Sequence, residues 1–300
     1  MSSEQLADGV NPLDAELAAT WDILKGYSGR NTDLGIARRF GGADAAYSLR
    51  DIGAMNGRVV EVRRDSDNAV EDFTANQVAS GAVEAFVGGS NSGYVSTWYD
   101  QSGNGRDMIQ PTTADQPRIV NSGTLETIDG KPTIKFLNVG TNLGSTFLKN
   151  TTNTPTANQV MSAYFVASTE TQLINRQTFA GGVSDLALSS IEQLLFRRGG
   201  SNRSFNTLRF SVDENSIATY SNDSSFVPTC RLNGTSATDV AFTGTVGETV
   251  FQLLGENSTG ASNDTFGLQG TMSEAILYND IEYDASIESD IANYYNITLS

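Results

Sequence analysis

From Ala45 to the end of the chain, short apolar runs alternate with clusters of Gly, Asn, Ser and Thr. The runs are rich in Val, Ile, Phe and Tyr, which is typical of strands that pack on a core and end in turns. Strands and helices do not alternate, so a parallel sheet with crossover helices is not expected. The pattern predicts an all-β fold, an antiparallel β-sandwich or jelly roll, over residues 45–300. The expected strands are 45–50, 58–63, 94–98, 118–120, 132–136, 160–167, 194–196, 208–212, 217–220, 250–254 and 275–278.

Helical periodicity occurs at the two ends of the chain. Asn11 and Pro12 are a helix start, and Leu13, Leu17, Trp21 and Leu24 then recur at helical spacing. We therefore expect residues 1–44 to form an N-terminal arm, an amphipathic helix over 12–25 and a glycine-rich linker. At the other end, Asp284 can cap a short C-terminal helix with Ile287, Ile291 and Tyr294 on one face.

The stretch 98–107, Trp-Tyr-Asp-Gln-Ser-Gly-Asn-Gly-Arg-Asp, ends an aromatic strand with a turn. Gly103 and Gly105 allow positive φ there, and Asp100 can accept backbone N–H bonds inside the turn. Trp98 and Tyr99 can anchor it to a core. We therefore predict first a corner of the β-structure and only second a site.

The charge balance restricts the partners of this protein. The chain has 19 Lys and Arg against 35 Asp and Glu, a formal charge of −16, so its field opposes nucleic acid and anionic membranes. No apolar run is long enough to insert into a membrane. We expect neither nucleic-acid binding nor membrane insertion.

The residue types present restrict the chemistry. The sequence has no His, which removes triads built on histidine and nearly every zinc or iron site, so catalysis would depend on carboxylates. Residues 65–68 resemble the start of a calcium loop, but Val70 and Asn76 stand where such a loop has Gly and Glu. We expect no metal and no cofactor. Cys230 is alone, so no disulfide can form within the chain.

Several of these segments resemble a known family of domains. Residues 46–50, 62–68 and 97–105, together with the ending 274–278 and 287–295, resemble concanavalin A-like (laminin G-like) sandwich domains of bacteriophage structural proteins. These domains are similar to the catalytic domain of family 54 α-L-arabinofuranosidases. The resemblance covers about residues 45–297.

For an enzyme, the resemblance implies two catalytic carboxylates. Residues 212–215, with Glu214, resemble the nucleophile segment of family 54, and residues 254–258, with Glu256, resemble the acid segment. Glu256 stands where the family has Asp, and the single Cys230 cannot supply the adjacent cysteine pair that forms the floor of the family's sugar pocket. Both differences count against hydrolysis.

We therefore expect a bacteriophage virion structural protein without enzyme activity. It would be made in the host cytoplasm and displayed on the virion surface, as a capsid decoration or a short tail appendage. Leu13, Leu17, Trp21 and Leu24 would anchor it to capsid or tail proteins or to a second copy in a homo-oligomer. Tyr94, Trp98 and Tyr99 are the candidates for binding a host-surface glycan. The alternatives are an arabinofuranosidase-like glycoside hydrolase, with Glu214 and Glu256, and a free lectin.

Overall fold

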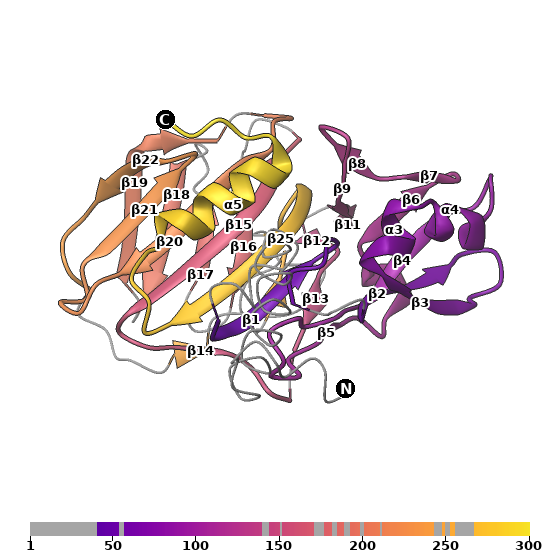
Figure 1. The fold of residues 1–300 in the computed structure, drawn as a ribbon, viewed down its shortest axis with the longest axis horizontal. Helices are drawn as coiled ribbons and strands as arrows, with labels where there is room; N and C mark the ends of the chain where they lie inside the picture. Colours follow the sequence, from indigo (N-terminus) through magenta and orange to yellow (C-terminus); the bar gives the residue numbers. More distant parts are fainter. Residues whose placement is uncertain are drawn as a thin grey trace, which may run out of the picture.

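The structure is a computed structural model, and its described part is two lobes of β-structure that share one core (Figure 1). The described residues are 41–53, 57–139, 144–150, 152–170, 177–181, 185–188, 193–198, 201–210, 212–242, 248–249, 253–255 and 267–300. The predicted N-terminal helix, with Leu13, Leu17, Trp21 and Leu24, lies outside these residues, as does Glu256.

One layer of the larger lobe is built on β25. This strand pairs antiparallel with β15 on one side and with β1 and β10 on the other. From β15 the layer continues through β20 and β21 to β22. Its strands are β1 (Ala43–Ser48), β10 (Ile134–Phe136), β15 (Met161–Thr169), β20 (Ser216–Asn222), β21 (Pro228–Leu232), β22 (Thr235–Thr238) and β25 (Gly270–Asn279).

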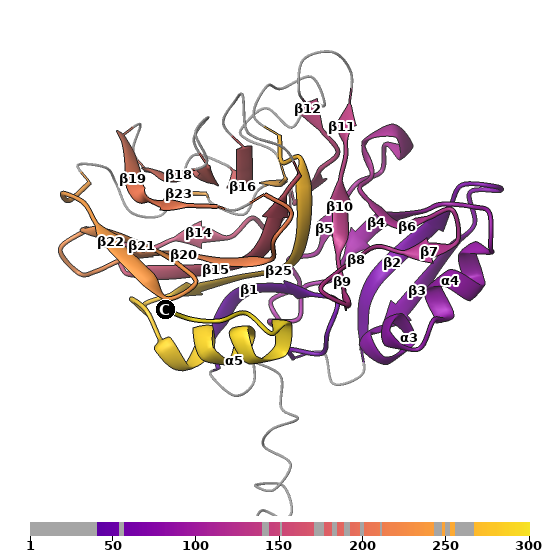
Figure 2. The same cartoon turned by 90° about the horizontal axis from the view of Figure 1, so that it is seen from above.

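A second layer lies over the first (Figure 2). It runs in the order β19, β18, β17, β16, β24, β13 and β5. This two-layered arrangement confirms the predicted all-β sandwich. Its strands are β5 (Met108–Ile109), β13 (Leu148–Lys149), β16 (Gln177–Gly181), β17 (Asp185–Leu188), β18 (Gln193–Arg198), β19 (Ser201–Arg209) and β24 (Leu253–Leu254).

The smaller lobe is an extension of the sandwich. The apolar pattern predicts its strands at 58–63, 94–98 and 118–120, but not their arrangement in a lobe of their own. Its strands pair in the order β3, β2, β4 and β6. β4 also pairs with β5 of the second layer, and β6 pairs with β10 of the first layer. The smaller lobe is therefore joined to both layers. Two short helices cover one face through Val78, Val83 and Val87. The elements are β2 (Arg58–Arg64), β3 (Val70–Thr74), α3 (Ala75–Ala79), α4 (Ala82–Val87), β4 (Gly93–Trp98), β6 (Arg118–Asn121) and β7 (Thr124–Leu125).

The C-terminal helix α5 (Ala285–Tyr295) packs on the outer face of the first layer (Figure 2). Asp284 caps it by accepting the backbone N–H of Ser286 at 2.8 Å, as predicted. Ile287 and Ile291 are fully buried, but the third position of the buried stripe is Tyr295, and Tyr294 is half-buried. Because α5 covers this face, β15 is buried on both faces along its whole length.

The remaining elements are short connections. They are the 3₁₀ helix η2 (Thr113–Asp115) and the strands β8 (Thr127–Ile128), β9 (Lys131–Pro132), β11 (Asn138–Val139), β12 (Gly144–Ser145), β14 (Thr156–Ala157) and β23 (Glu248–Thr249). In the described part of the chain, no helix has the length and apolar character needed to cross a membrane.

Candidate functional site

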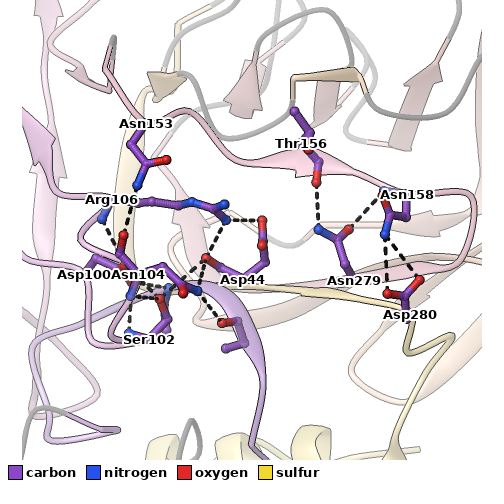
Figure 3. Close-up of polar contacts among 12 residues, drawn as sticks. Asp44, Asp100, Ser102, Asn104, Arg106, Asn153, Thr156, Asn158, Asn279 and Asp280 are labelled. Carbon is purple, nitrogen blue, oxygen red and sulfur yellow. Dashed lines mark hydrogen bonds and ion pairs between the residues drawn. The ribbon is translucent and has the colours of Figure 1, made fainter.

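The stretch from Trp98 to Asp107 is a structural corner held by the Asp100 carboxylate (Figure 3). Asp100 Oδ1 accepts the backbone N–H groups of Ala46 at 3.0 Å and of Ser102 at 2.9 Å. Asp100 Oδ2 accepts the backbone N–H of Arg106 at 3.0 Å. Charge-assisted bonds of this kind are the stronger hydrogen bonds of proteins. The predicted role of Asp100 as an acceptor of backbone N–H groups is confirmed.

The same corner is tied to strand β1 (Figure 3). Asn104 Nδ2 donates to the carbonyl oxygens of Ala43 at 3.1 Å and Asp44 at 3.0 Å. Arg106 Nη1 donates to the Asp44 carbonyl at 2.7 Å and forms an ion pair with its carboxylate. These groups bind the chain to itself, so the most distinctive motif of the sequence serves the fold.

Trp98 belongs to the core. Its side chain has 0% exposure, and its ring lies 5.8 Å from that of Tyr47 between centroids. The indole N–H has no hydrogen-bond partner among the described residues. A fully buried ring has no face to offer a sugar, so the predicted role of Trp98 in carbohydrate binding is corrected.

Tyr94 and Tyr99 are the other two predicted sugar-binding residues, and both are half-buried. Tyr94 lies on β4, and Tyr99 directly follows this strand. The Tyr99 hydroxyl donates to Asp72 at 2.6 Å, and the Arg58 guanidinium lies 4.3 Å from the Tyr99 ring centroid. Burial, followed by the bond to Asp72, raises the pKa of Tyr99 above its usual range. The Arg63 guanidinium lies 5.0 Å from the Tyr94 ring. For both tyrosines, sugar binding stays a prediction.

Glu214 lies exposed in the turn between β19 and β20. Val212 forms a parallel bridge with Thr169 at the end of β15, and the Asp213 N–H donates to the Thr169 carbonyl at 2.7 Å. Asp213 has a φ of 58°, a left-handed conformation that Asp tolerates better than most residues. The turn is thus fixed to the first layer and presents the Glu214 carboxylate to solvent.

The residue after Glu214 carries an unused amide. Asn215 is 7% exposed, and neither its side-chain oxygen nor its nitrogen has a hydrogen-bond partner among the described residues. The buried Thr169 hydroxyl beneath the turn is without a partner in the same part of the chain. Leaving such a group unpaired costs about 1 to 3 kcal/mol, and native proteins rarely do so without a functional reason. Sequence reasoning missed Asn215, because only its burial distinguishes it from other asparagines.

A charged group flanks the turn. Lys135 on β10 is 9% exposed and forms an ion pair with Glu170, which directly follows Thr169. Burial lowers the pKa of Lys135; Glu126 and Asp213 act in the opposite direction, and Arg118 acts in the same direction as burial. Glu170 directly follows Thr169, whose carbonyl accepts the Asp213 N–H, so the Lys135 ion pair lies one residue from the point where the Glu214 turn is attached.

The segment before Glu256 approaches the same place. The Gly255 N–H donates to the Phe179 carbonyl at 2.9 Å, and the Phe179 ring lies 5.4 Å from that of Phe210, just before the Glu214 turn. Gly255 has a φ of +82°, and an added Cβ would lie 2.2 Å from Cδ1 of Phe136, so only glycine fits. Gly255, which precedes Glu256, and Phe210, four residues before Glu214, therefore both contact Phe179.

Glu274, by contrast, is a structural carboxylate. It has 0% exposure, and it accepts the Arg50 Nε at 2.8 Å, the Arg50 Nη2 at 3.0 Å and the Ser48 hydroxyl at 2.8 Å. Burial alone would lower the pKa of Arg50, but Glu274 raises it above its usual value. Its oxygens are engaged, so Glu274 is not a catalytic candidate.

The described residues contain no group of three or more His, Cys, Asp or Glu that could hold a metal ion. Cys230 lies on β21 with 0% exposure, and burial raises the pKa of its thiol well above the usual value. Cys230 therefore belongs to the core and is not placed to line a sugar pocket.

The fold is similar to that of solved glycoside hydrolases. A GH54 α-L-arabinofuranosidase soaked with a cyclic sulfate inhibitor matches with a TM-score of 0.58 and 15% identity, over 86% of this chain and 64% of that chain. A mutant of a GH54 α-L-arabinofuranosidase soaked with 4-nitrophenyl α-L-arabinofuranoside matches with the same values. An arabinofuranosidase complexed with arabinofuranosyl-α-1,2-xylobiose matches with a TM-score of 0.53 at the same identity and coverage. No protein-family profile matches the sequence, and neither does any curated protein.

These matches correct the functional prediction. The similarity to the family 54 domain is confirmed at the level of the fold. The prediction of a virion structural protein without enzyme activity is contradicted, because the similar structures are glycoside hydrolases and nothing supports a phage particle. An acidic composition and a lone buried Cys230 restrict chemistry and compartment, but they are compatible with carboxylate catalysis. The chain spans 64% of the length of the GH54 structures.

Proposed function

We propose that this protein is a glycoside hydrolase that acts on α-L-arabinofuranosides, with Glu214 as the nucleophile and Glu256 as the acid. One observation carries the proposal: in a fold similar to that of arabinofuranosidases, Phe179 contacts both Gly255, which precedes Glu256, and Phe210, four residues before Glu214. Two carboxylates on opposite sides of a glycosidic bond are the usual requirement for its hydrolysis.

The chemistry follows the retaining pathway. The Glu214 carboxylate attacks the anomeric carbon while the acid transfers its proton to the departing glycosidic oxygen, which leaves a glycosyl ester on Glu214. The acid residue then deprotonates a water molecule, which attacks the same carbon and releases the sugar and the free carboxylate. This pathway needs the two carboxyl groups about 5 to 5.5 Å apart.

The surroundings of the turn support these roles. Glu214 is exposed, and its turn is fixed through Thr169, so the nucleophile is accessible and held in place. The Asn215 amide is buried and has no partner among the described residues, so it is free to bind a sugar hydroxyl. Lys135, ion-paired with Glu170, lies close to Thr169, to which the turn is attached.

A chromogenic arabinofuranoside tests the proposal. We expect 4-nitrophenyl α-L-arabinofuranoside to be hydrolysed, and Glu214→Gln to lower kcat/KM by about a thousandfold or more, because an amide cannot act as the nucleophile. Glu71→Gln, at an exposed position on β3, is the matched control and should retain full activity.

Two outcomes would refute the proposal. The first is a folded protein with no turnover of this substrate, and the second is turnover that survives Glu214→Gln. Glycan binding without turnover would favour the free lectin. Azide added to Glu214→Ala gives a further check, since a small nucleophile should restore cleavage and yield a glycosyl azide.

A further inference from the structure

A cavity lies in the smaller lobe, apart from the Glu214 turn. Its volume is about 410 Å³, which is within the size range of small-molecule sites. Arg63 and Asp65 line it from the end of β2, and Tyr94 lines it from β4. The 3₁₀ helix η2 contributes Thr113 and Ala114.

The cavity contains a fixed arginine and an aromatic ring. Arg63 is 8% exposed, its Nε donates to Gln116 Oε1 at 2.7 Å, and its Nη1 donates to Asn68 Oδ1 at 3.0 Å. Gln116 is in turn fixed by donating to the Gln110 carbonyl at 2.8 Å. The Arg63 guanidinium lies 5.0 Å from the Tyr94 ring. The donors and the ring are therefore positioned before any ligand arrives.

The lining groups suit a neutral, hydroxyl-rich ligand. Arg63 supplies hydrogen-bond donors, and the exposed Asp65 supplies acceptors and an opposite charge, so neither sign dominates. The exposed Thr113 adds a hydroxyl group that can donate and accept, while the buried Thr146 hydroxyl accepts the Leu137 N–H at 2.9 Å. The Tyr94 ring offers the apolar surface on which the C–H face of a sugar packs.

The cavity and the Glu214 turn are connected through paired residues of β4, β6 and β10. Tyr94 is the cross-strand neighbour of Arg118, and Arg118 is that of Lys135, so their side chains share a face. Lys135 pairs with Glu170, next to Thr169, which holds the Glu214 turn. Tyr94 and Lys135 are two strand spacings apart, about 10 Å.

We propose that this cavity is a binding subsite for a sugar unit of the same glycan chain that is cleaved at Glu214. The proposal rests on the proposed function for the identity of the glycan, but binding at the cavity does not require turnover. Tyr94 packs against the sugar ring, while Arg63 and Asp65 bind its hydroxyl groups and Gln116 holds Arg63 in place. The site thus favours polymeric arabinofuranosides over isolated ones.

The test is affinity electrophoresis of the full chain in gels containing arabinoxylan. The Glu214→Gln protein serves as the parent, so binding is measured without hydrolysis. We expect the parent to be retarded, and Ala114→Trp, which fills the exposed mouth of the cavity, to raise the dissociation constant about tenfold or more. Ala114→Ser controls for a change at that position and should bind like the parent.

Variants of two tyrosines distinguish glycan binding at the cavity from glycan binding elsewhere on the protein surface. Tyr99 also packs under an arginine of β2, Arg58, but does not line the cavity. Tyr94→Ala should weaken binding and Tyr99→Ala should not, with thermal unfolding used to verify that each variant is folded. Retardation unchanged by Ala114→Trp, or no retardation of the parent, would overturn the subsite. Binding lost in Ala114→Trp from a protein without turnover would refute only the proposed hydrolysis.

Discussion

Two polar side chains, the half-buried Asp100 and the buried Asn215, stand in opposite situations. The Asp100 carboxylate accepts three backbone N–H groups and the Ser102 hydroxyl, and it holds a corner together. The Asn215 amide, beside Glu214, has no partner among the described residues. Asp100 lies in the most distinctive stretch of the sequence, whereas Asn215 lies in the segment 212–215, where the resemblance singled out only Glu214.

The difference shows how structural and functional polar groups can be separated. A side chain that binds its own backbone has no capacity left for a ligand, and removing it leaves backbone groups unpaired. A buried polar group without a partner weakens the fold, and it indicates a site only together with a second observation, because the unpaired Trp98 indole N–H belongs to the core. For Asn215, that second observation is the exposed Glu214 carboxylate beside it.

The largest effect on stability is expected from Asp100→Ala. Three backbone N–H groups lose their acceptor, so we expect a loss of about 3 to 5 kcal/mol in the free energy of unfolding. Asp100→Asn keeps one acceptor oxygen and should cost about half as much. Urea denaturation measures both. A loss below about 1 kcal/mol for Asp100→Ala would contradict the structural role of the corner.

The next effect is expected at Gly255, which precedes Glu256. An alanine Cβ would lie 2.2 Å from the buried Phe136 ring, so Gly255→Ala should cost about 2 to 4 kcal/mol. Gly130 also has positive φ, at +73°, but nothing lies within 4 Å of its added Cβ. Gly130→Ala should therefore cost only about 1 kcal/mol of backbone strain. Equal losses in thermal unfolding would show that the Phe136 contact is unimportant.

Asn215→Leu tests the other side of the comparison. Replacing an unpaired buried amide by an apolar side chain should raise the free energy of unfolding by about 1 kcal/mol and lower kcat/KM for the chromogenic substrate. Asn150 is the matched control: it is 4% exposed, accepts the N–H groups of Thr152 and Asn153, and donates to Asp107. Asn150→Leu should destabilise the protein, and destabilisation by both variants would mean that Asn215 has a structural role.

The smallest effect is expected at Asp67, an exposed turn carboxylate. The bond from Arg64, followed by that from the Ala69 N–H, lowers the pKa of Asp67 to about 2. Because this value is below that of the unfolded chain, about 3.9, the stabilisation is present above pH 4 and is lost as the pH falls toward 2. Asp67→Asn should be slightly less stable than the parent at pH 7, and this difference should shrink as the pH falls through 2 and vanish only below it. A difference in stability that did not shrink between pH 4 and pH 1 would exclude the charge as its cause.

The chain's local patterns were sufficient for the all-β fold, for the corner at Asp100 and for the helix capped by Asp284. Each depends on neighbouring residues: the spacing of apolar positions, the glycines of a turn, or a cap beside its helix. The short helices α3 and α4 were missed, because one or two turns give too little periodicity to recognise.

Tertiary structure alone decided the rest. Phe179 contacts both Gly255, which precedes Glu256, and Phe210, which precedes the Glu214 turn, and Tyr94 meets Arg63 in a cavity of the smaller lobe. Burial removed Trp98 from the candidate sugar-binding residues and revealed Asn215. These outcomes depend on contacts between residues far apart in the chain, which are set by how the two layers pack and which no local pattern encodes.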